Sequence, residues 1–191
     1  MTGDIKQRKK IIRQQYLRIR DAVSADELRV NSETITGHLL GSAMYADCAE
    51  VFVYNSMRSE VITSGIISAA LTSGRVVALP VTTPTDLTFV RITSTDGLIK
   101  SSFGVYEPAL DANRVVRAGP RTLVIAPGAV FASDGRRIGY GGGYYDRYLS
   151  ENTYMAAVGL CIDAQLCDDV PADAFDVRMD YIITESGVIG I

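Results

Sequence analysis

The chain has 191 residues, of which 47% are hydrophobic and 21% charged, and its formal net charge is −3. This length supports a sizeable core and this composition excludes a disordered or fibrous protein, so we predict one globular domain over residues 1–191. The sequence contains no run of about 18 or more apolar residues and no apolar signal-peptide region, so neither a membrane span nor export is expected. The slightly negative charge argues against nucleic-acid binding.

Cysteine and histidine usage narrows the chemistry. Cys48, Cys161 and Cys167 are an odd number without CxxC spacing, which is typical of reduced thiols in a cytoplasmic protein and disfavours a zinc site. The single histidine, His38, falls in a predicted helix. Histidine-dependent nucleophilic catalysis is therefore hard to build, which leaves carboxylates, Lys, Arg and backbone amides, with Mg²⁺ as the expected metal.

Two helices are predicted at the N-terminus. Apolar residues recur at helical spacing along the first: Ile12, Tyr16, Ile19 and Val23. Seven of the 19 Lys and Arg residues lie in the first 20 positions, which fits either an anionic ligand or a solvated face. Ser24 and Glu27 form a capping-box pattern, so a second helix is expected to begin there and to end near Gly41.

The rest of the chain alternates between apolar strand patterns and helix patterns. The predicted strands are 50–56, 75–81, 87–93, 121–128, 155–162 and 180–186, and the predicted helices are 63–73 and one from about Tyr144. Segment 87–93 alternates and is expected to be the more exposed strand, whereas 75–81 and 121–128 are nearly continuous apolar runs. We therefore predict an α/β three-layer sandwich with a largely parallel open sheet and helices on both faces.

Loops after parallel strands gather at the carboxyl edge of a sheet, where ligands bind in open α/β folds. The loops after Tyr54, Leu79, Ile125 and Ile162 should meet there. This places residues 55–60, residues 80–82 and the run from Pro127 to the glycine-rich segment in one neighbourhood, which is the predicted site.

The glycine-rich segment, Arg136 to Leu149, reads RRIGYGGGYYDRYL. Its bare backbone amides at a helix start fit an anion site, although a tight strand-to-helix turn explains them equally. It is neither a dinucleotide fingerprint, because Tyr144 stands where a glycine is required, nor a Walker A loop, because the chain has no Gly-Lys pair. The guanidinium groups of Arg136 and Arg137 could neutralise a polyphosphate. Asp146 fits either Mg²⁺ or a carboxylate that complements the helix dipole.

The segment PGAVFASDGRRIGYGGGYYDRYL resembles the signature of the 5-formyltetrahydrofolate cyclo-ligase family. The resemblance extends through KKIIR, VFVYNSM, SEVIT, VALPV, FGVYEPA, VGLCIDAQL and VRMDYIITE, in that order. It implies a NagB/RpiA/CoA-transferase-like fold and an ATP- and Mg²⁺-dependent ring closure of 5-formyltetrahydrofolate to 5,10-methenyltetrahydrofolate. The implied partners are ATP and the folate, including polyglutamylated forms, and the implied protein is a monomer.

The resemblance also implies a role for individual residues. The ATP-binding set is Lys9, Lys10, Arg13, Arg137, Ile138, Gly139, Tyr140, Gly141, Gly142, Gly143, Tyr144 and Tyr145. The substrate-binding set is Asn55, Met57, Glu60, Tyr140, Gly141, Gly142, Gly143 and Tyr144. From the residues alone, Met57, Phe103 and Tyr106 fit either a flat apolar wall for a pterin or ordinary core. Arg137 and Tyr144 are the catalytic residues, and Asp146 and Asp180 the metal ligands. The chain departs from the family pattern at Ile62, Ala132 and Phe175, which bears on folate preference.

Two other functions fit parts of the pattern. A sugar-phosphate isomerase would use the glycine-rich segment for one phosphate, but the basic N-terminal helix suggests more negative charge than that. A nucleotide-binding regulatory module would need no catalytic groups. Against this stand the polar side chains that converge on one place: Glu60, Arg137, Tyr144 and Asp146.

Overall fold

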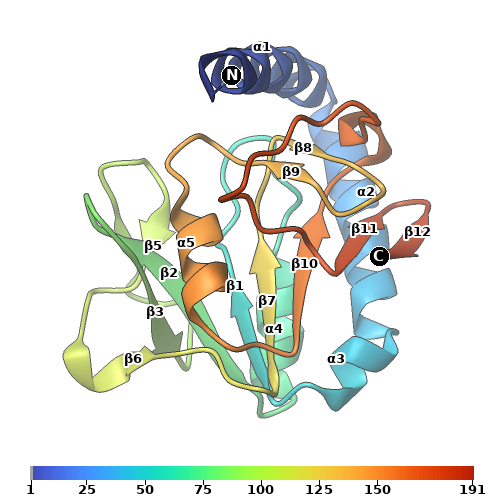
Figure 1. The fold of residues 1–191 in the computed structure, drawn as a ribbon. Helices are drawn as coiled ribbons and strands as arrows, with labels where there is room; N and C mark the ends of the chain where they lie inside the picture. The colour runs from blue at the N-terminus through green and yellow to red at the C-terminus, as the bar shows by residue number, and fades with distance from the viewer. Residues whose placement is uncertain (1) are drawn as a thin grey trace.

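A mixed eight-stranded sheet forms the centre of the molecule (Figure 1). The computed structural model describes residues 2–191. The strand order is β12-β11-β10-β7-β1-β2-β3-β6, in which the neighbouring strands from β11 to β2 run parallel and the edge strands antiparallel. The bounds are β1 (Glu50–Val53), β2 (Val76–Thr82), β3 (Leu87–Ile92), β6 (Val115–Val116), β7 (Thr122–Ala126), β10 (Ala156–Leu160), β11 (Tyr181–Thr184) and β12 (Gly187–Gly190).

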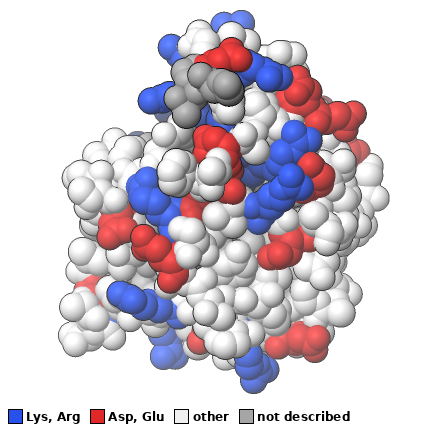
Figure 2. Space-filling view, viewed as in Figure 1, with Lys and Arg blue, Asp and Glu red and all other residues white. Residues whose placement is uncertain are grey.

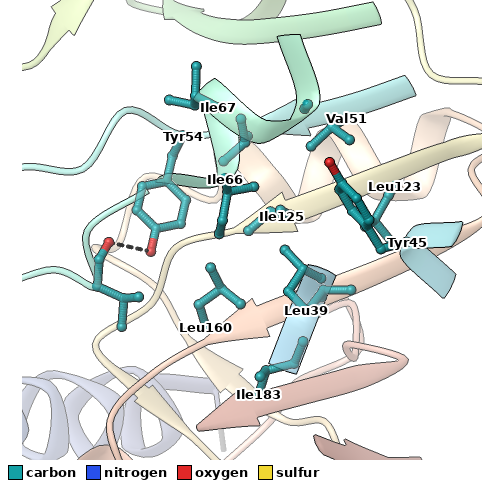
Figure 3. Packing of buried hydrophobic residues seen from close by; sticks show 14 of the residues in the cluster. Leu39, Tyr45, Val51, Tyr54, Ile66, Ile67, Leu123, Ile125, Leu160 and Ile183 are labelled. Atoms are coloured by element: carbon teal, nitrogen blue, oxygen red, sulfur yellow. Dashed lines mark hydrogen bonds between the residues drawn. The ribbon is translucent and has the colours of Figure 1, made fainter. Parts of the chain in front are cut away.

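The inner strands are apolar along their length because both faces are covered. Every residue of β7 and of β10 is buried. The helices are α1 (Thr2–Asp21), α2 (Ala25–Leu40), α3 (Ala43–Asp47), α4 (Ser64–Thr72) and α5 (Tyr144–Glu151). α2, α3 and α4 pack on one face, where Leu39, Ile66 and Ile125 join one apolar cluster (Figure 3). α5 packs on the other face through Tyr148 and Leu149, so the predicted three-layer sandwich is confirmed.

The first helix packs largely as the sequence indicated, with one exception. α1 lies across the ends toward which the parallel strands point (Figure 1). Its partly buried residues Ile12, Tyr16 and Leu17 pack against the cluster of Val130, Ile138 and their neighbours. Ile19, predicted on the inner face, is 38% exposed, whereas Arg20 is buried. The inner face therefore carries polar site residues, which an apolar periodicity cannot reveal.

Strand β3 is more buried than its alternating sequence indicated. Of its residues only Arg91 is exposed, and the ring of Phe89 lies 4.8 Å from that of Tyr148 and 4.9 Å from that of Phe52, centroid to centroid. α5 covers the face of the strand that carries Phe89, and β3 still has an exposed residue where the inner residues of β2 are all buried.

Several short elements were not predicted from sequence. They are α3, the hairpin of β4 (Ile99–Lys100) and β5 (Tyr106–Glu107), the hairpin of β8 (Val130–Phe131) and β9 (Arg137–Ile138), the single turns η1 (Ala112–Arg114) and η2 (Asp163–Gln165), and the edge strands β6 and β12. Runs of two to five residues give too little periodicity to detect. Among the described helices, none combines the length and apolarity needed to cross a membrane.

Close packing at β10 yields a stability prediction. A methyl group at Gly159 would lie 2.8 Å from Cδ1 of Phe131 and 2.9 Å from Cδ1 of Ile182, inside a buried layer. Gly159→Ala should therefore lower the free energy of unfolding by about 1–3 kcal/mol in urea denaturation. Gly37→Ala is the control: its methyl group meets nothing within 4 Å, so this helix substitution should raise stability by about 0.5–1 kcal/mol. A Gly159→Ala protein as stable as wild type would contradict this packing.

Candidate active site

Three segments that are distant in sequence meet at the carboxyl edge of the sheet, as predicted. The loop after β1 meets the glycine-rich segment where the Tyr140 hydroxyl donates to Oε1 of Glu60. The last turn of α1 reaches the same point, because Nη1 of Arg20 donates to the Tyr140 hydroxyl at 2.8 Å. The loop after β2 joins them through the Tyr144 hydroxyl, 3.4 Å from the carbonyl oxygen of Pro84.

Backbone conformation explains part of the glycine content. Gly141 has φ 101° and Gly143 φ 66°, the left-handed region that glycine adopts without strain. Gly143 is the N-cap of α5 and has no side chain with which to cap it. The first N–H groups of α5 are thus left to an external acceptor, and the helix dipole favours an anion there.

Arginine side chains surround this segment. Nε of Arg13 donates to the carbonyl oxygen of Gly139 at 2.6 Å, and Nη1 of Arg147 donates to that of Gly142 at 2.9 Å. Arg137 is buried, with Nη2 on Oδ1 of Asp146 at 2.8 Å and Nη1 on the carbonyl oxygen of Pro127 at 3.0 Å. The expectation that Arg136 adds to this charge is wrong. It lies just before β9 and pairs instead with Asp134 and with the backbone carbonyls of Asp168 and Val170.

Two buried polar atoms beside the segment have no hydrogen-bond partner in the described structure: Nε of Arg137 and the hydroxyl of Tyr145. Burial, followed by the charge of Glu60, raises the pKa of Tyr145, so its hydroxyl keeps its proton. Unsatisfied buried donors are costly, and here they lie where a phosphorylated ligand would supply acceptors.

Glu60 is a buried carboxylate, 7% exposed, with both oxygens in use. Oε1 accepts from Tyr140, and Oε2 accepts from the backbone N–H of Met57 at 2.9 Å. Burial raises the pKa of Glu60 above its usual value, although the two hydrogen bonds and the charge of Arg20 oppose this. Arg20 is a site residue that was not predicted from the sequence. Its position four residues after Tyr16, on the predicted inner face of the helix, is the pattern that could have indicated its burial.

The remaining predicted substrate residues line one side of the same loop. Nδ2 of Asn55 donates to the carbonyl oxygen of Tyr106 at 2.9 Å, which ties the β4–β5 hairpin to the loop after β1. Phe103 and Tyr106 are each 53% exposed, and Met57 is partly buried. Of these residues, Met57 lies directly beside Glu60, because its backbone N–H donates to Oε2 of that carboxylate.

The cations of α1 face acidic residues. Lys9 Nζ pairs with Asp173 at 2.9 Å and with Asp176, and Arg8 pairs with Asp169 at 3.0 Å. Figure 2 shows basic and acidic side chains next to each other across the top of the molecule, where α1 and the C-terminal segment lie. Burial alone would lower the pKa of Lys9, but the hydrogen bonds to Asp176 and Asp173 raise it overall. Lys10 is exposed and makes none of these contacts.

The two predicted metal ligands are not brought together. Asp146 lies in the first turn of α5, where Oδ1 accepts from Arg137 and from the N–H of Val177 at 3.3 Å. Asp180 precedes β11, and its Oδ2 accepts from the N–H of Ala157 at 2.7 Å, near the start of β10. Within residues 2–191 no group of three or more His, Cys, Asp or Glu side chains could hold a metal ion.

The fold and the site are typical of α/β enzymes that act on phosphorylated ligands at the carboxyl edge of a sheet. The family model for 5-formyltetrahydrofolate cyclo-ligases matches residues 5–185. A probable 5-formyltetrahydrofolate cyclo-ligase of Caenorhabditis elegans is 30% identical, covering 97% of this chain and 96% of that protein. The Haemophilus influenzae cyclo-ligase is 27% identical, covering 93% and 97%. The chain belongs to the 5-formyltetrahydrofolate cyclo-ligase family.

Solved structures agree with this assignment. The 5,10-methenyltetrahydrofolate synthetase of Aquifex aeolicus superposes with a TM-score of 0.84 at 27% identity, covering 95% of this chain and 92% of that one. The synthetase of Mycoplasma pneumoniae gives 0.75 at 22% identity and shows the shared fold alone.

The environment of Glu60 yields a pH prediction. Because its pKa is raised on folding, the folded state binds the Glu60 proton more tightly than the unfolded chain, so stability falls as pH rises from about 4.3. Glu60→Gln removes this titration. The variant should be more stable than wild type at pH 7, and the gain should vanish below about pH 4, as measured by thermal denaturation across that range. If the stability gain of Glu60→Gln grew toward low pH, the pKa of Glu60 would be lowered on folding and not raised.

Proposed function

We propose that this protein cyclises 5-formyltetrahydrofolate to 5,10-methenyltetrahydrofolate with conversion of ATP to ADP and phosphate. The observation that carries the proposal is the contact between the glycine-rich segment and Glu60. It sets a phosphate-binding element against a buried acceptor for N–H donors, so both substrates of such a reaction meet in one place. Membership of the family supports this assignment over an isomerase or a non-catalytic nucleotide-binding module.

On the nucleotide side, the triphosphate would lie on the amides at the start of α5, between Arg13 and Arg137. Arg137 is held rigidly by Asp146 and Pro127, which makes it a pre-positioned charge for the transferred phosphoryl group. Tyr144, beside the Gly142 backbone, would border the reacting groups. Lys9 would exchange its carboxylate partners for a phosphate oxygen, since both are anionic acceptors.

On the folate side, Glu60 would accept the amino and ring N–H groups of the pterin, because a carboxylate is an acceptor-only group. Asn55, Met57, Phe103 and Tyr106 would form the wall beside the ring. We propose that polyglutamylated folates are also accepted, with their tails leaving over this half-open side.

Two bonds form in sequence. The formyl oxygen attacks the γ-phosphorus and ADP leaves. N10 then attacks the activated formyl carbon, loses its proton, and phosphate departs with the oxygen. The chain contributes position and charge neutralisation, which suits a site without histidine.

Asp146 fits a magnesium ligand. Both of its hydrogen bonds use Oδ1, so Oδ2 is left for a cation, and the side chain is 21% exposed. Mg²⁺ held there would supply positive charge to neutralise the phosphates of ATP. Asp180 is supported as a second ligand by the family resemblance alone. A monomeric, cytoplasmic protein remains our prediction; the described free thiols Cys48, Cys161 and Cys167 are compatible with it.

The direct test is the absorbance of purified protein mixed with 5-formyltetrahydrofolate, ATP and Mg²⁺. The product has a conjugated chromophore that the substrate lacks. Absorbance should rise only when ATP and Mg²⁺ are both present. A flat trace from protein that binds ATP would overturn the folate assignment.

Asp146→Asn tests the magnesium site. The amide keeps the shape of the first turn but loses the charge, so we expect metal-dependent turnover to fall about 10- to 100-fold at ordinary Mg²⁺, with unchanged unfolding. Raised Mg²⁺ should restore part of the rate. Asp111→Asn, on the exposed η1 turn, is the control. Full activity of Asp146→Asn at ordinary Mg²⁺ would exclude Asp146 as a ligand.

Glu60→Gln separates the two substrates. The change replaces one carboxylate oxygen, an acceptor, by an NH₂ group, a donor. Under the proposed function this donor would face the N–H donors of the pterin. Affinity for 5-formyltetrahydrofolate should fall at least about tenfold in calorimetry, while affinity for Mg²⁺-ATP stays at the wild-type value. Loss of ATP binding instead would show that the two ligands are placed the wrong way round.

A further inference from the structure

Arg20 is a buried cation that joins two loops of the site. It lies in the last turn of α1 and is 4% exposed. Nε donates to Oγ of Ser59 at 2.9 Å, next to Glu60, and Nη1 donates to the Tyr140 hydroxyl at 2.8 Å. The guanidinium carbon also lies 5.9 Å from the centre of the Tyr140 ring. A guanidinium buried this deeply is fixed by its partners and fixes them in turn.

The Tyr140 hydroxyl has two roles at once: it accepts from Arg20 and donates to Glu60. Hydrogen bonds in such a chain strengthen one another, so donation by Arg20 makes the hydroxyl a stronger donor. Burial, followed by the charge of Glu60, raises the pKa of Tyr140, so this proton stays on the tyrosine at neutral pH.

This hydrogen bond uses the carboxylate that the proposed function assigns to the folate. With Oε1 on Tyr140 and Oε2 on the N–H of Met57, both oxygens of Glu60 already have a donor. The crevice beside them is narrow and is lined by Arg20, Tyr54, Glu60, Val61, Gly128 and Gln165 among others. Each carboxylate oxygen can accept a second hydrogen bond, but Glu60 is 7% exposed and the crevice beside it has no room even for a water molecule. An N–H donor on the ligand therefore needs the position beside Oε1 that the Tyr140 hydroxyl occupies.

We propose that Tyr140 is an internal competitor of the folate for Glu60, and that Arg20 is the positioning residue that holds Tyr140 there. This rests on the proposed function, because Glu60 is taken as the folate acceptor. When folate binds, the hydroxyl leaves Glu60 but keeps its bond from Arg20. Tyr140 belongs to the glycine-rich segment, so the entry of one substrate rearranges the binding element of the other.

The first test measures binding of 5-formyltetrahydrofolate without ATP, by calorimetry. Tyr140→Phe removes the competing O–H and keeps the ring, so it should bind the folate about 3- to 10-fold more tightly than wild type. Weaker binding would make Tyr140 a direct folate ligand and overturn the proposal. Tyr181→Phe, which removes a hydroxyl at the start of β11, is the control and should bind as wild type does.

A double-mutant cycle tests the role of Arg20. If Arg20 acts through Tyr140, Arg20→Lys should tighten folate binding in the wild-type background and change it by less than about twofold in the Tyr140→Phe background. Equal effects in both backgrounds would show that Arg20 supports the fold alone and would overturn its positioning role.

A third measurement needs no folate and so stands apart from the proposed reaction. Hydrogen exchange of the free protein should be faster for the amides of residues 139–143 in Tyr140→Phe and in Arg20→Lys than in wild type, and unchanged in the strands. Unchanged exchange in that segment would overturn the competition. A flat absorbance trace from wild type in the cyclisation assay would instead overturn the proposed reaction. The hydrogen-exchange result for residues 139–143 would not be affected.

Discussion

Parallel strands that are buried on both faces can present polar groups only at their ends, and the site follows from this constraint. β1, β2, β7 and β10 all end at one edge, where the loops leave the apolar layers. Tyr54 marks the transition. Its ring belongs to the core while its hydroxyl bonds the carbonyl oxygen of Val61 at 3.2 Å, which fixes the loop that carries Glu60 (Figure 3). The core between the sheet and these helices therefore also positions the site, because the core residue Tyr54 holds the loop that carries Glu60.

Positively charged side chains at this edge of the sheet form ion pairs with carboxylates. Arg137 with Asp146 and Lys9 with Asp173 and Asp176 are cations that already have carboxylate partners. A buried ion pair contributes little net stability, but removal of one partner is costly. Under the proposed function, such pairs hold a cation at the edge of the sheet until an anionic ligand replaces the carboxylate. Glu60 is the corresponding case of a buried negative charge. Hydrogen bonds from Tyr140 and Met57 and the charge of the nearby Arg20 stabilise its carboxylate.

Much of this architecture was predictable from sequence because the longer elements carry strong periodic signals. The predicted strand at 121–128 and the helix from Tyr144 correspond to β7 and α5, and the Ser24 hydroxyl accepts from the N–H of Glu27 at 3.2 Å as an N-cap. The same signals could not show side-chain direction. Arg136 lies just before β9 and Arg137 within it, and the two side chains pair with different carboxylates, Asp134 and Asp146. The basic residues of the first helix likewise do not show by composition that Arg20 is buried and Arg18 exposed. The roles of Lys10 and Asp180 come from family resemblance alone and stay predictions.

The reach of α1 across the sheet has a consequence for the order of folding. Arg13 bonds the carbonyl oxygen of Gly139, and Lys9 bonds Asp176, so α1 finds its partners 126 and 167 residues further along the chain. Contacts of such long sequence separation form late, because loop closure has to be offset before they stabilise anything. The sheet and its covering helices can therefore assemble while the site is still open. During synthesis α1 therefore lacks these contacts until the segments around Gly139 and Asp176 have been made, and only then can it pack across the sheet.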